Sequence, residues 1–430
     1  MSDRQVPDRL GALSLRLVRK PLGNYVRPFP RDFNHTARMV AEAHKIGTGV
    51  IIDPRDLSRS ADLRKLAREE GLEVILDPLS VELSTEGGFG RGGMAELPWA
   101  AGRPHRVEDF SAIVIASFCR TLARMAVDTG SKAVLIPTHH LDSLPNRWLG
   151  VDHEIALELR GALDAAGGRD IMMYYPLVVR LQVIQSAALR EYLIGRLSQT
   201  VAARAVDAVW LRVPGFGVTH SGPVNLRRYF QLARATHALN VPIVAERTGT
   251  LGLALLAFGV VGGVEQGITF GEGYDLTRLT KPASGRGFLP APRVYVPELG
   301  IQLSRDLARE LLSNRTLRNR LGCQRACCRH GADDMLGDPR RHFLVSRASE
   351  IAELSQVPPA LRADHYLETW LRPASDRATH AARIVPRLLS QRERLDQWRT
   401  TLSDLRVRDR LEEPSRSPVP TGIRIERRGA

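Results

Sequence analysis

Ionisable and hydrogen-bonding side chains stand at the ends of most β-rich runs in the first 270 residues. They are Asp53, Asp77, Thr138-His139-His140 with Asp142, Tyr174-Tyr175, Arg212, Glu246-Arg247 and Glu265-Gln266. A carboxylate beside an arginine stays ionised, whereas one near apolar walls or another carboxylate holds a proton more readily. Gathered in one place, such groups could perform general acid–base or nucleophilic catalysis.

We therefore expect four carboxylates to be catalytic and three basic side chains to bind substrate. The catalytic candidates are Glu265, Asp77, Glu246 and Asp53, and the binding candidates are Arg212, Arg247 and His139. Alternatives remain open. Glu265 could be a buried ion-pair partner of an arginine, and each Asp-Pro pair could serve only to turn the chain. The whole cluster could also be a binding surface without chemistry.

The densest chemical signal is a cysteine cluster, Cys323-Gln-Arg-Ala-Cys327-Cys328-Arg-His330. Clustered cysteine and histidine in a chain with only four cysteines predict a structural Zn²⁺ site with three sulfur ligands and one nitrogen ligand. The fourth ligand could come from His330, His342 or His365, of which His330 and His365 are the primary candidates. A metal-free cysteine cluster or a redox pair are the alternatives.

Positive charge is concentrated toward the C-terminal end. The formal net charge is +14, and residues 301–430 contain 25 Arg, no Lys and 17 acidic residues. The guanidinium group of arginine can donate two parallel hydrogen bonds to phosphate oxygens. A nucleic-acid partner, tRNA or DNA, is therefore expected. The alternative is a set of solvated helices carrying Arg–Glu pairs.

The elements that must position these residues alternate between apolar strands and helices. The strand candidates are 13–18, 49–53, 72–77, 132–137, 170–175, 208–213, 242–246 and 263–268. Strands that are apolar throughout are typical of a parallel sheet buried on both faces. Eight strands with intervening helices predict an α/β fold, a (β/α)8 TIM-type barrel, whose active site lies at the C-terminal ends of the strands. A doubly wound open sheet is the alternative.

The predicted domain organisation has three parts. Residues 1–300 form the barrel, with an insertion at about 79–104 whose glycine-rich stretch 86–93 could be an active-site lid or a phosphate cradle. Residues 301–411 form a helical, Cys-rich and Arg-rich module that binds zinc. Residues 412–430, rich in proline, are expected to be a disordered tail.

Length and composition exclude several classes of protein. The 430 residues are 43% hydrophobic and 25% charged, which allows a large core. The longest apolar stretch, 251–264, has 14 residues and four glycines, so no membrane span is expected. The absence of a secretory signal and the few cysteines favour a cytoplasmic location. A homodimer is left open.

A barrel followed by a Cys-rich zinc module on a basic chain resembles the tRNA-guanine transglycosylase superfamily and its DNA-modifying relatives. The resemblance implies base exchange at a glycosidic bond, with Glu265 in the segment 262–267 at the place of the nucleophilic aspartate. It assigns the acid/base role to Asp77 or to the segment 85–89. It also assigns base binding to Gly215 and Gly217 in Val213-Pro-Gly-Phe-Gly. The cysteine spacing departs from the family pattern.

Three functional hypotheses follow. The first is a base-modifying enzyme of the transglycosylase type acting on tRNA or DNA. The second is a small-molecule barrel enzyme of the lyase or aldolase type, in which no lysine stands at a strand end to form an imine. The third is a non-catalytic nucleic-acid-binding component derived from such a barrel.

Overall fold

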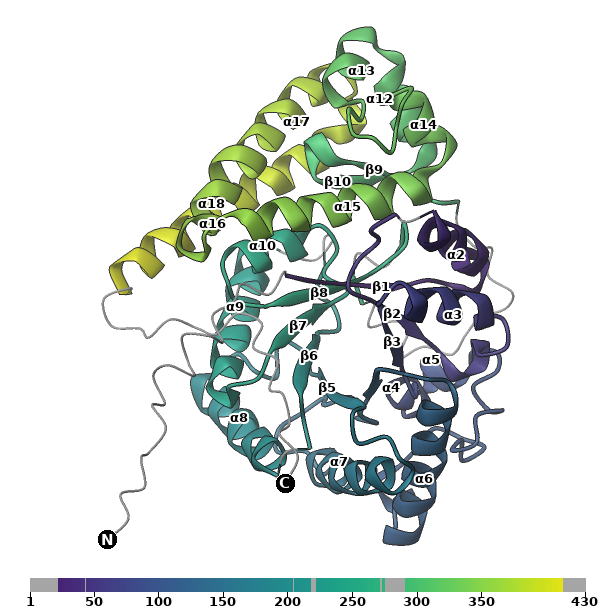
Figure 1. The fold of residues 1–430 in the computed structure, drawn as a ribbon. Helices are drawn as coiled ribbons and strands as arrows, with labels where there is room; N and C mark the ends of the chain where they lie inside the picture. The colour runs from purple at the N-terminus through teal and green to yellow at the C-terminus, as the bar shows by residue number, and fades with distance from the viewer. Residues whose placement is uncertain are drawn as a thin grey trace, which may run out of the picture.

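Eight short parallel strands close into a barrel in the computed structural model, which describes residues 22–42, 44–203, 205–217, 222–270, 273–274 and 291–412. The strands follow chain order around the barrel, and β1 pairs with β8 to close it (Figure 1). They are β1 (Gly23–Arg27), β2 (Gly49–Ile52), β3 (Glu73–Leu76), β4 (Ala133–Leu135), β5 (Met172–Val178), β6 (Ala208–Arg212), β7 (Ile243–Glu246) and β8 (Gly263–Gly267). The predicted TIM-type barrel is confirmed, and the open sheet is excluded.

Helices lie between successive strands, and the longer ones cover the outside of the barrel. They are α2 (Phe33–Ala41), α3 (Ala61–Glu69), α4 (Ser80–Leu83), α5 (Glu86–Phe89), α6 (Ala112–Asp128), α7 (Trp148–Ala165), α8 (Ala187–Ala202), α9 (Pro223–Thr236) and α10 (Leu251–Ala257). Because helices cover one face of each strand and the barrel interior covers the other, the strands are buried almost throughout. This double burial explains their continuous runs of Val, Ile and Leu.

Aromatic side chains fill the middle of the barrel. The ring of Trp210 lies 5.0 Å from that of Tyr25 and 5.6 Å from that of Tyr174, measured between centroids. Trp210 is completely buried. The interior is therefore a packed core, and only the layer above it, at the C-terminal strand ends, is open to chemistry.

The first barrel strand differs from the prediction. The expected strand at 13–18 lies outside the described residues, and β1 takes its place, in register with β2 and β8. Pro28 follows directly and ends the strand, because proline has no N–H to donate to the neighbouring strand. This shift places Arg27 at a strand end.

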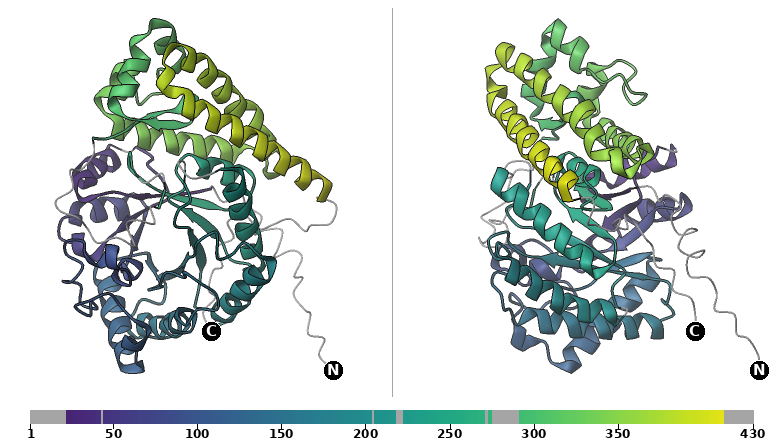
Figure 2. Two further views of the ribbon diagram at one scale, coloured as in Figure 1. Left: turned by 180° about the vertical axis from the view of Figure 1, so that it is seen from behind. Right: turned by 90° about the vertical axis from the view of Figure 1, so that its left-hand side faces the viewer.

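The C-terminal module contains a hairpin and a set of helices stacked on one side of the barrel (Figure 2). Its elements are β9 (Val294–Val296), β10 (Ile301–Leu303), α12 (Arg305–Ser313), α13 (Arg315–Leu321), α14 (Ala332–Gly337), α15 (Pro339–Gln356), α16 (Pro359–His365), the π-helix Tyr366–Leu371, α17 (Arg372–Ile384) and α18 (Leu389–Glu412). We expected residues 301–411 to be helical, without strands. This expectation is wrong at its start, because β10 forms there and pairs with β9. Residue 300, the expected domain boundary, is the turn of this hairpin.

Helix α15 packs on the seam between β1 and β8, where a barrel of this type needs its eighth helix. Its Phe343 and Leu344 belong to the same buried cluster as Val26 of β1 and Ile268 after β8. The Arg340 side chain lies 2.6 Å from the carboxylate of Asp32. The module is therefore part of the barrel's core packing.

Two further observations concern the sequence predictions. Residues 413–430 of the expected tail lie outside the described residues. Among the helices that the structure describes, none combines the length and the apolar character that a bilayer crossing requires.

Candidate active site and metal centre

The strand-end residues form one layer directly above the aromatic core. Successive side chains alternate across a strand, so a residue two positions after an inward-facing one also points inward. Tyr25 is followed in this way by Arg27, Trp210 by Arg212, and Val244 by Glu246. The layer of charges at the mouth is thus set by the same alternation that builds the core.

Arg27 lies at the centre of this layer and contacts four carboxylates from four strands. Its Nη1 lies 2.8 Å from Asp77 and 3.3 Å from Asp53. Its Nε lies 3.0 Å from Glu265, and its Nη2 lies 3.4 Å from Glu246. The planar guanidinium has five N–H donors that point in several fixed directions. A lysine ammonium has three donors that rotate about a single nitrogen.

Arg212 forms a second hub on the other side of the same layer. Its Nη2 lies 2.8 Å from Glu246 and 3.1 Å from Asp77, and its Nη1 lies 3.6 Å from Glu82. The hydroxyl of Tyr274 donates to Glu82 at 3.0 Å. The predicted gathering of Asp77, Arg212, Glu246 and Glu265 at one rim is therefore what the structure shows.

The carboxylates differ in their pKa. Burial raises the pKa of Glu265, and the nearby Glu246 raises it further, against the opposing charge of Arg27. Burial also raises the pKa of Asp53, with Arg27 opposing. Burial likewise opposes ionisation of Asp77, but Arg27 and Arg212 outweigh it and hold the pKa of Asp77 well below its usual range. The layer thus contains an ionised carboxylate next to carboxyl groups that can hold a proton.

Three residues with a strained backbone conformation lie at the same barrel mouth. Leu79, Arg247 and Thr269 have φ values of 61°, 53° and 58°, in the left-handed region that side-chain-bearing residues seldom adopt. Each follows a strand end by a few residues. The backbone N–H of Arg247 donates to the Glu265 carboxylate at 3.1 Å, and that of Leu79 donates to Asp77 at 2.9 Å. Strain of this kind concentrates at functional sites, where the surrounding structure maintains it.

A cleft of about 780 Å³ opens from this layer toward the insertion at 79–104. Five arginines and four carboxylates line it: Arg27, Arg55, Arg59, Arg91, Arg247, Asp53, Asp56, Glu82 and Glu96. The Asp53 side chain is 22% exposed, whereas those of Glu265 and Glu246 have no exposed surface. Asp53 is therefore the raised-pKa carboxyl group that a molecule in the cleft would meet.

The glycine-rich stretch 86–93 supplies part of the wall of this cleft. Gly92 and Gly93 line the cleft, and the Arg55 guanidinium donates to the carbonyl of Gly92 at 2.9 Å. A side chain at Gly88 would lie only 2.3 Å from the carbonyl oxygen of Glu82, so the close approach of two backbones requires glycine there.

Of the predicted binding residues only Arg247 lines the cleft: Arg212 is buried in the charge layer, and the other three do not line the cleft either. His139 is buried with its ring stacked on Trp148 at 3.7 Å, and its Nδ1 lies 2.6 Å from the carboxylate of Asp152. Gly215 and Gly217 contact residues 273–274 through their backbones and do not line the cleft. The substrate-binding role expected of these three residues therefore has no support in the geometry.

Sequence reasoning missed Arg27, Glu82 and Tyr274. Arg27 escaped because the first strand was placed too early, although the run Tyr25-Val26 followed by Pro28 was a usable signal. Glu82 lies on the short helix α4 inside the insertion, and Tyr274 lies after the last strand. Neither has a sequence spacing that points to the mouth.

The cysteine cluster forms a compact, buried donor set with His342. One ligand atom each from Cys323, Cys327, Cys328 and His342 lies within 4.8 Å of all the others. The Sγ atoms of Cys323 and Cys327 are 3.6 Å apart, and the Sγ of Cys328 is 3.3 Å from Nδ1 of His342. Zinc bond lengths of about 2.3 Å to sulfur and 2.0 Å to nitrogen place tetrahedral ligands about 3.5–3.8 Å apart, so the set fits.

A second contact orients the histidine for such a role. The Nε2 atom of His342 lies 2.8 Å from the carbonyl oxygen of Tyr295. In the tautomer with its proton on Nε2, the Nε2–H group donates to this carbonyl. The Nδ1 atom is then unprotonated and can face the sulfurs, as metal-binding histidines require. The geometry is therefore compatible with a metal site.

The histidines first expected as ligands lie elsewhere. His330 is exposed and its Nδ1 lies 3.2 Å from Asp334, and the ring of His365 packs edge-on against Trp370. His342 replaces them because it lies on α15, one turn before Ser346, and both side chains face the cysteines. Sequence distance from the cysteines was a poor guide, since the loop and α14 fold back before α15 begins.

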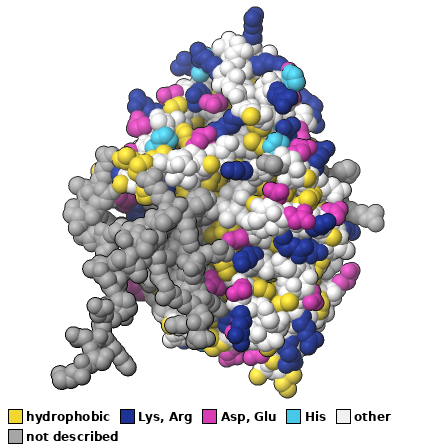
Figure 3. Space-filling model, viewed as in Figure 1, with side chains coloured by type: hydrophobic (Ala, Val, Ile, Leu, Met, Phe, Trp, Pro, Cys, Tyr) yellow, Lys and Arg dark blue, Asp and Glu magenta, His cyan; other side chains and the backbone are white. Residues whose placement is uncertain are grey.

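Many arginines of the module form ion pairs with acidic residues. The pairs include Arg325–Glu353, Arg387–Glu310, Arg377–Glu298, Arg372–Glu368 and Arg406–Asp364, all within 3.0 Å. On the face drawn in Figure 3, basic and acidic side chains are interspersed. This pattern favours the alternative of solvated helices with Arg–Glu pairs, and a nucleic-acid partner stays a prediction.

Comparisons with known proteins give structural similarity only. No family model matches the chain, and no curated protein matches it. Similar solved structures include a putative phosphonomutase from Burkholderia cenocepacia J2315 (18% identity, 60% of this chain and 91% of that chain, TM-score 0.33). A type I 3-dehydroquinate dehydratase from Clostridium difficile is also similar (11%, 60% and 90%, 0.36). So is xylanase 10B from Thermotoga maritima (10%, 60% and 86%, 0.39).

The expected resemblance to the tRNA-guanine transglycosylase superfamily is wrong. These similar structures are a phosphonomutase, a dehydratase and a xylanase, and none is a transglycosylase. The site agrees with this correction: Glu265, at the place of the nucleophile, has no exposed surface and its oxygens are held by Arg27 and by the N–H of Arg247.

Proposed function

We propose that this protein is an enzyme that binds a small organic acid in the cleft at the barrel mouth and transfers a proton through Asp53. The observation that carries the proposal is the position of Asp53. It lines the cleft between Arg27, at 3.3 Å, and Arg55, at 3.2 Å, and burial raises its pKa. A carboxyl group whose pKa approaches the working pH exchanges protons efficiently.

The arginines of the cleft select an anionic substrate. Five guanidinium groups line the cleft, and the side chains of Arg247 and Arg59 are 17% and 71% exposed. A carboxylate or phosphonate group accepts from such planar donors in pairs. The partly exposed guanidinium groups of Arg59 and Arg247 are the ones that such a group would meet.

The remaining charged residues act as positioning groups. Glu265 and Glu246 are fully covered and hold Arg27 and Arg212 in place. In the proposed step, the carboxylate of Asp53 takes a proton from a substrate carbon next to a carbonyl. The electron pair of that C–H bond forms a carbon–carbon double bond, and the π pair of the carbonyl moves onto its oxygen, where a guanidinium stabilises the negative charge. Return of a proton from Asp53 completes the cycle.

An imine mechanism is not part of this proposal. None of the described residues that line the cleft is a lysine. Lys132 precedes β4 and therefore lies at the opposite end of the barrel from the cleft. The small-molecule lyase alternative thus remains, but without a mechanism that forms an imine with a lysine.

Exchange of substrate protons with deuterium tests the proposal. Pyruvate, 2-oxobutyrate and 2-oxoglutarate are incubated with the full chain in D₂O, and loss of the proton signal next to the carbonyl is followed by NMR. Asp53→Asn should slow the exchange by about 10²-fold or more, because general base catalysis contributes that much. Asp62→Asn, at an exposed position of α3 outside the cleft, is the matched control and should leave the exchange rate unchanged. Exchange equal to that of protein-free solution, or unchanged in Asp53→Asn, would refute the proposal.

We also propose that the Cys323, Cys327, Cys328 and His342 set holds a structural Zn²⁺. A site with four buried ligand residues, and so no open position for substrate, is typical of structural zinc. Such an ion would join the loop 322–331 to α15, which itself packs against β1 and β8. The metal would thus stabilise the module and, through α15, the closure of the barrel.

A further inference from the structure

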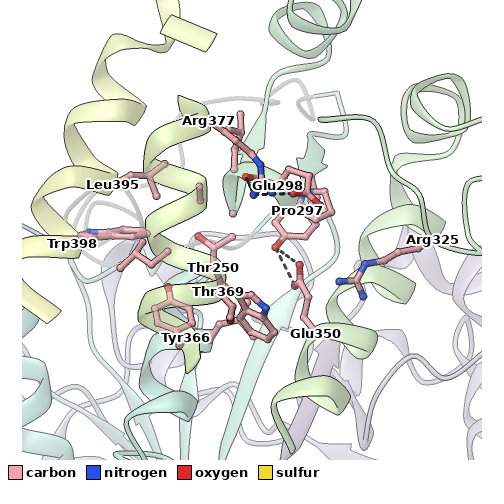
Figure 4. Close-up of a pocket in the computed structure, with 17 residues that line it drawn as sticks. Thr250, Pro297, Glu298, Arg325, Glu350, Tyr366, Thr369, Arg377, Leu395 and Trp398 are labelled. Atoms are coloured by element: carbon pink, nitrogen blue, oxygen red, sulfur yellow. Dashed lines mark hydrogen bonds and ion pairs between the residues drawn. The ribbon is translucent and has the colours of Figure 1, made fainter. Parts of the chain in front are cut away.

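A second cavity, of about 270 Å³, lies where the module meets the barrel (Figure 4). Helix α10 of the barrel forms one side of it. The β9–β10 hairpin, the π-helix Tyr366–Leu371, α17 and α18 form the others. It shares no lining residue with the cleft at the barrel mouth. The cavity is therefore a site separate from the cleft of the proposed substrate.

Aromatic rings form much of the wall. Tyr366 and Trp370 stand at 77° to each other with centroids 6.0 Å apart, so they meet like two walls of a corner. Trp398, with 2% of its surface exposed, lines the cavity from α18, and Tyr295 lines it from β9. Aromatic walls of this kind favour a flat ring, which can stack on one face and present its edge to another.

A buried hydroxyl supplies a polar contact. Thr250 lies just before α10 and is 4% exposed, and Figure 4 shows it near the centre of the cavity. Within the described part of the chain its Oγ1 has no hydrogen-bond partner. Buried polar groups are nearly always paired, so an unpaired hydroxyl lining a cavity marks a place where a ligand can bind.

The charges around the cavity are already balanced. Glu350 pairs with Arg347 at 3.1 Å and accepts from the Tyr295 hydroxyl at 2.8 Å. Arg325 pairs with Glu353 at 2.8 Å, and Arg377 pairs with Glu298 at 2.9 Å. A ligand with a net charge would enter without a counterion and lose its hydration. The cavity therefore favours a ligand with no net charge.

We infer that this cavity is a binding site for a planar aromatic molecule without net charge that hydrogen-bonds to Thr250. Its volume equals that of about nine water molecules, at about 30 Å³ each, which suits a single ring or a fused pair of rings. The ring lies among Tyr366, Trp370 and Trp398, and its polar edge faces the Thr250 hydroxyl.

Three probes of nearly the same shape test the charge argument. Benzamide is neutral, benzoate is an anion and benzamidine is a cation, and adenine adds a fused neutral ring. Binding to the full chain is measured by calorimetry and by tryptophan fluorescence, since Trp370 and Trp398 line the cavity. Benzamide or adenine should bind at least about tenfold more tightly than both charged probes.

Two isosteric variants test the place of binding. Thr250→Val removes the hydroxyl and should weaken binding of the neutral probe by about fivefold, the effect of one hydrogen bond. Thr248→Val also removes a buried hydroxyl without a partner in the described chain, but it lies outside the cavity and should leave binding unchanged. Equal unfolding midpoints show that both variants are folded.

Three outcomes would overturn the inference. They are no binding of benzamide or adenine up to about 10 mM, binding of a charged probe as tight as that of the neutral ones, or Thr250→Val binding like the unchanged protein.

Discussion

The substitution Arg27→Met tests whether the charge layer at the barrel mouth holds together through one side chain. Arg27 is 8% exposed and contacts carboxylates of Asp53, Asp77, Glu246 and Glu265 at 2.8–3.4 Å. Methionine fills much of the same volume and cannot donate. Removing one partner of a buried ion pair costs about 3–5 kcal/mol, so we expect a loss of that size in the free energy of unfolding at pH 7.

The pKa shifts of the carboxylates predict how the loss of unfolding free energy changes with pH. In the unchanged protein Arg27 and Arg212, against the effect of burial, lower the pKa of Asp77, so its ionised form stabilises the fold above the unfolded pKa of about 3.9. That contribution is lost only as the pH falls through the lowered folded value. Without Arg27 the folded pKa of Asp77 rises, and so do those of Asp53 and Glu265, which burial already raises. The loss of stability should therefore grow from pH 5 to pH 8.

Urea unfolding at pH 5, 6, 7 and 8 measures this loss. Arg55→Met is the matched control, because Arg55 contacts Asp53 alone among the four carboxylates and its side chain is 25% exposed. It should cost less than about 1 kcal/mol, as partly exposed ion pairs do. A loss below about 1 kcal/mol for Arg27→Met at every pH, or a loss that shrinks as the pH rises, would refute the reasoning.

Three further predictions follow from other parts of the structure. Elemental analysis should find zinc in the purified chain; His342→Ala should remove it, whereas His330→Ala, at an exposed histidine, should retain it, and equal metal content in both variants would contradict the assigned ligand set. Trp210→Ala should lower the unfolding free energy by about 3–5 kcal/mol, because it empties the barrel core, and a loss under about 1 kcal/mol would contradict the packing. RNA binding, measured by fluorescence anisotropy, should change by less than about tenfold between 50 and 200 mM salt, because many of the module's arginines already pair with acidic residues; a loss of about 10³-fold would instead indicate many phosphate contacts.

The sequence predicted the barrel because its signal is local and repeated. Seven of the eight barrel strands lie within predicted strands or overlap them closely, since a parallel strand buried on both faces must be apolar along its length. The same rule located Asp77, Arg212, Glu246 and Glu265, because parallel strands all end at one rim. The first strand was misplaced, since two apolar runs lay near the N-terminal end and only pairing with β2 and β8 selects one of them.

The residue types at the strand ends and the cysteine cluster were thus determined by the sequence alone, because alternation along a strand and short spacing are local properties. Their partners were decided by tertiary structure. Arg27 meets Glu265 across 238 positions of the chain, and His342 meets the cysteines only because α14 and α15 fold back over them. Which carboxyl group reaches the cleft, and which are covered by arginines, depends on burial and distance in three dimensions, and no spacing along the chain encodes either quantity.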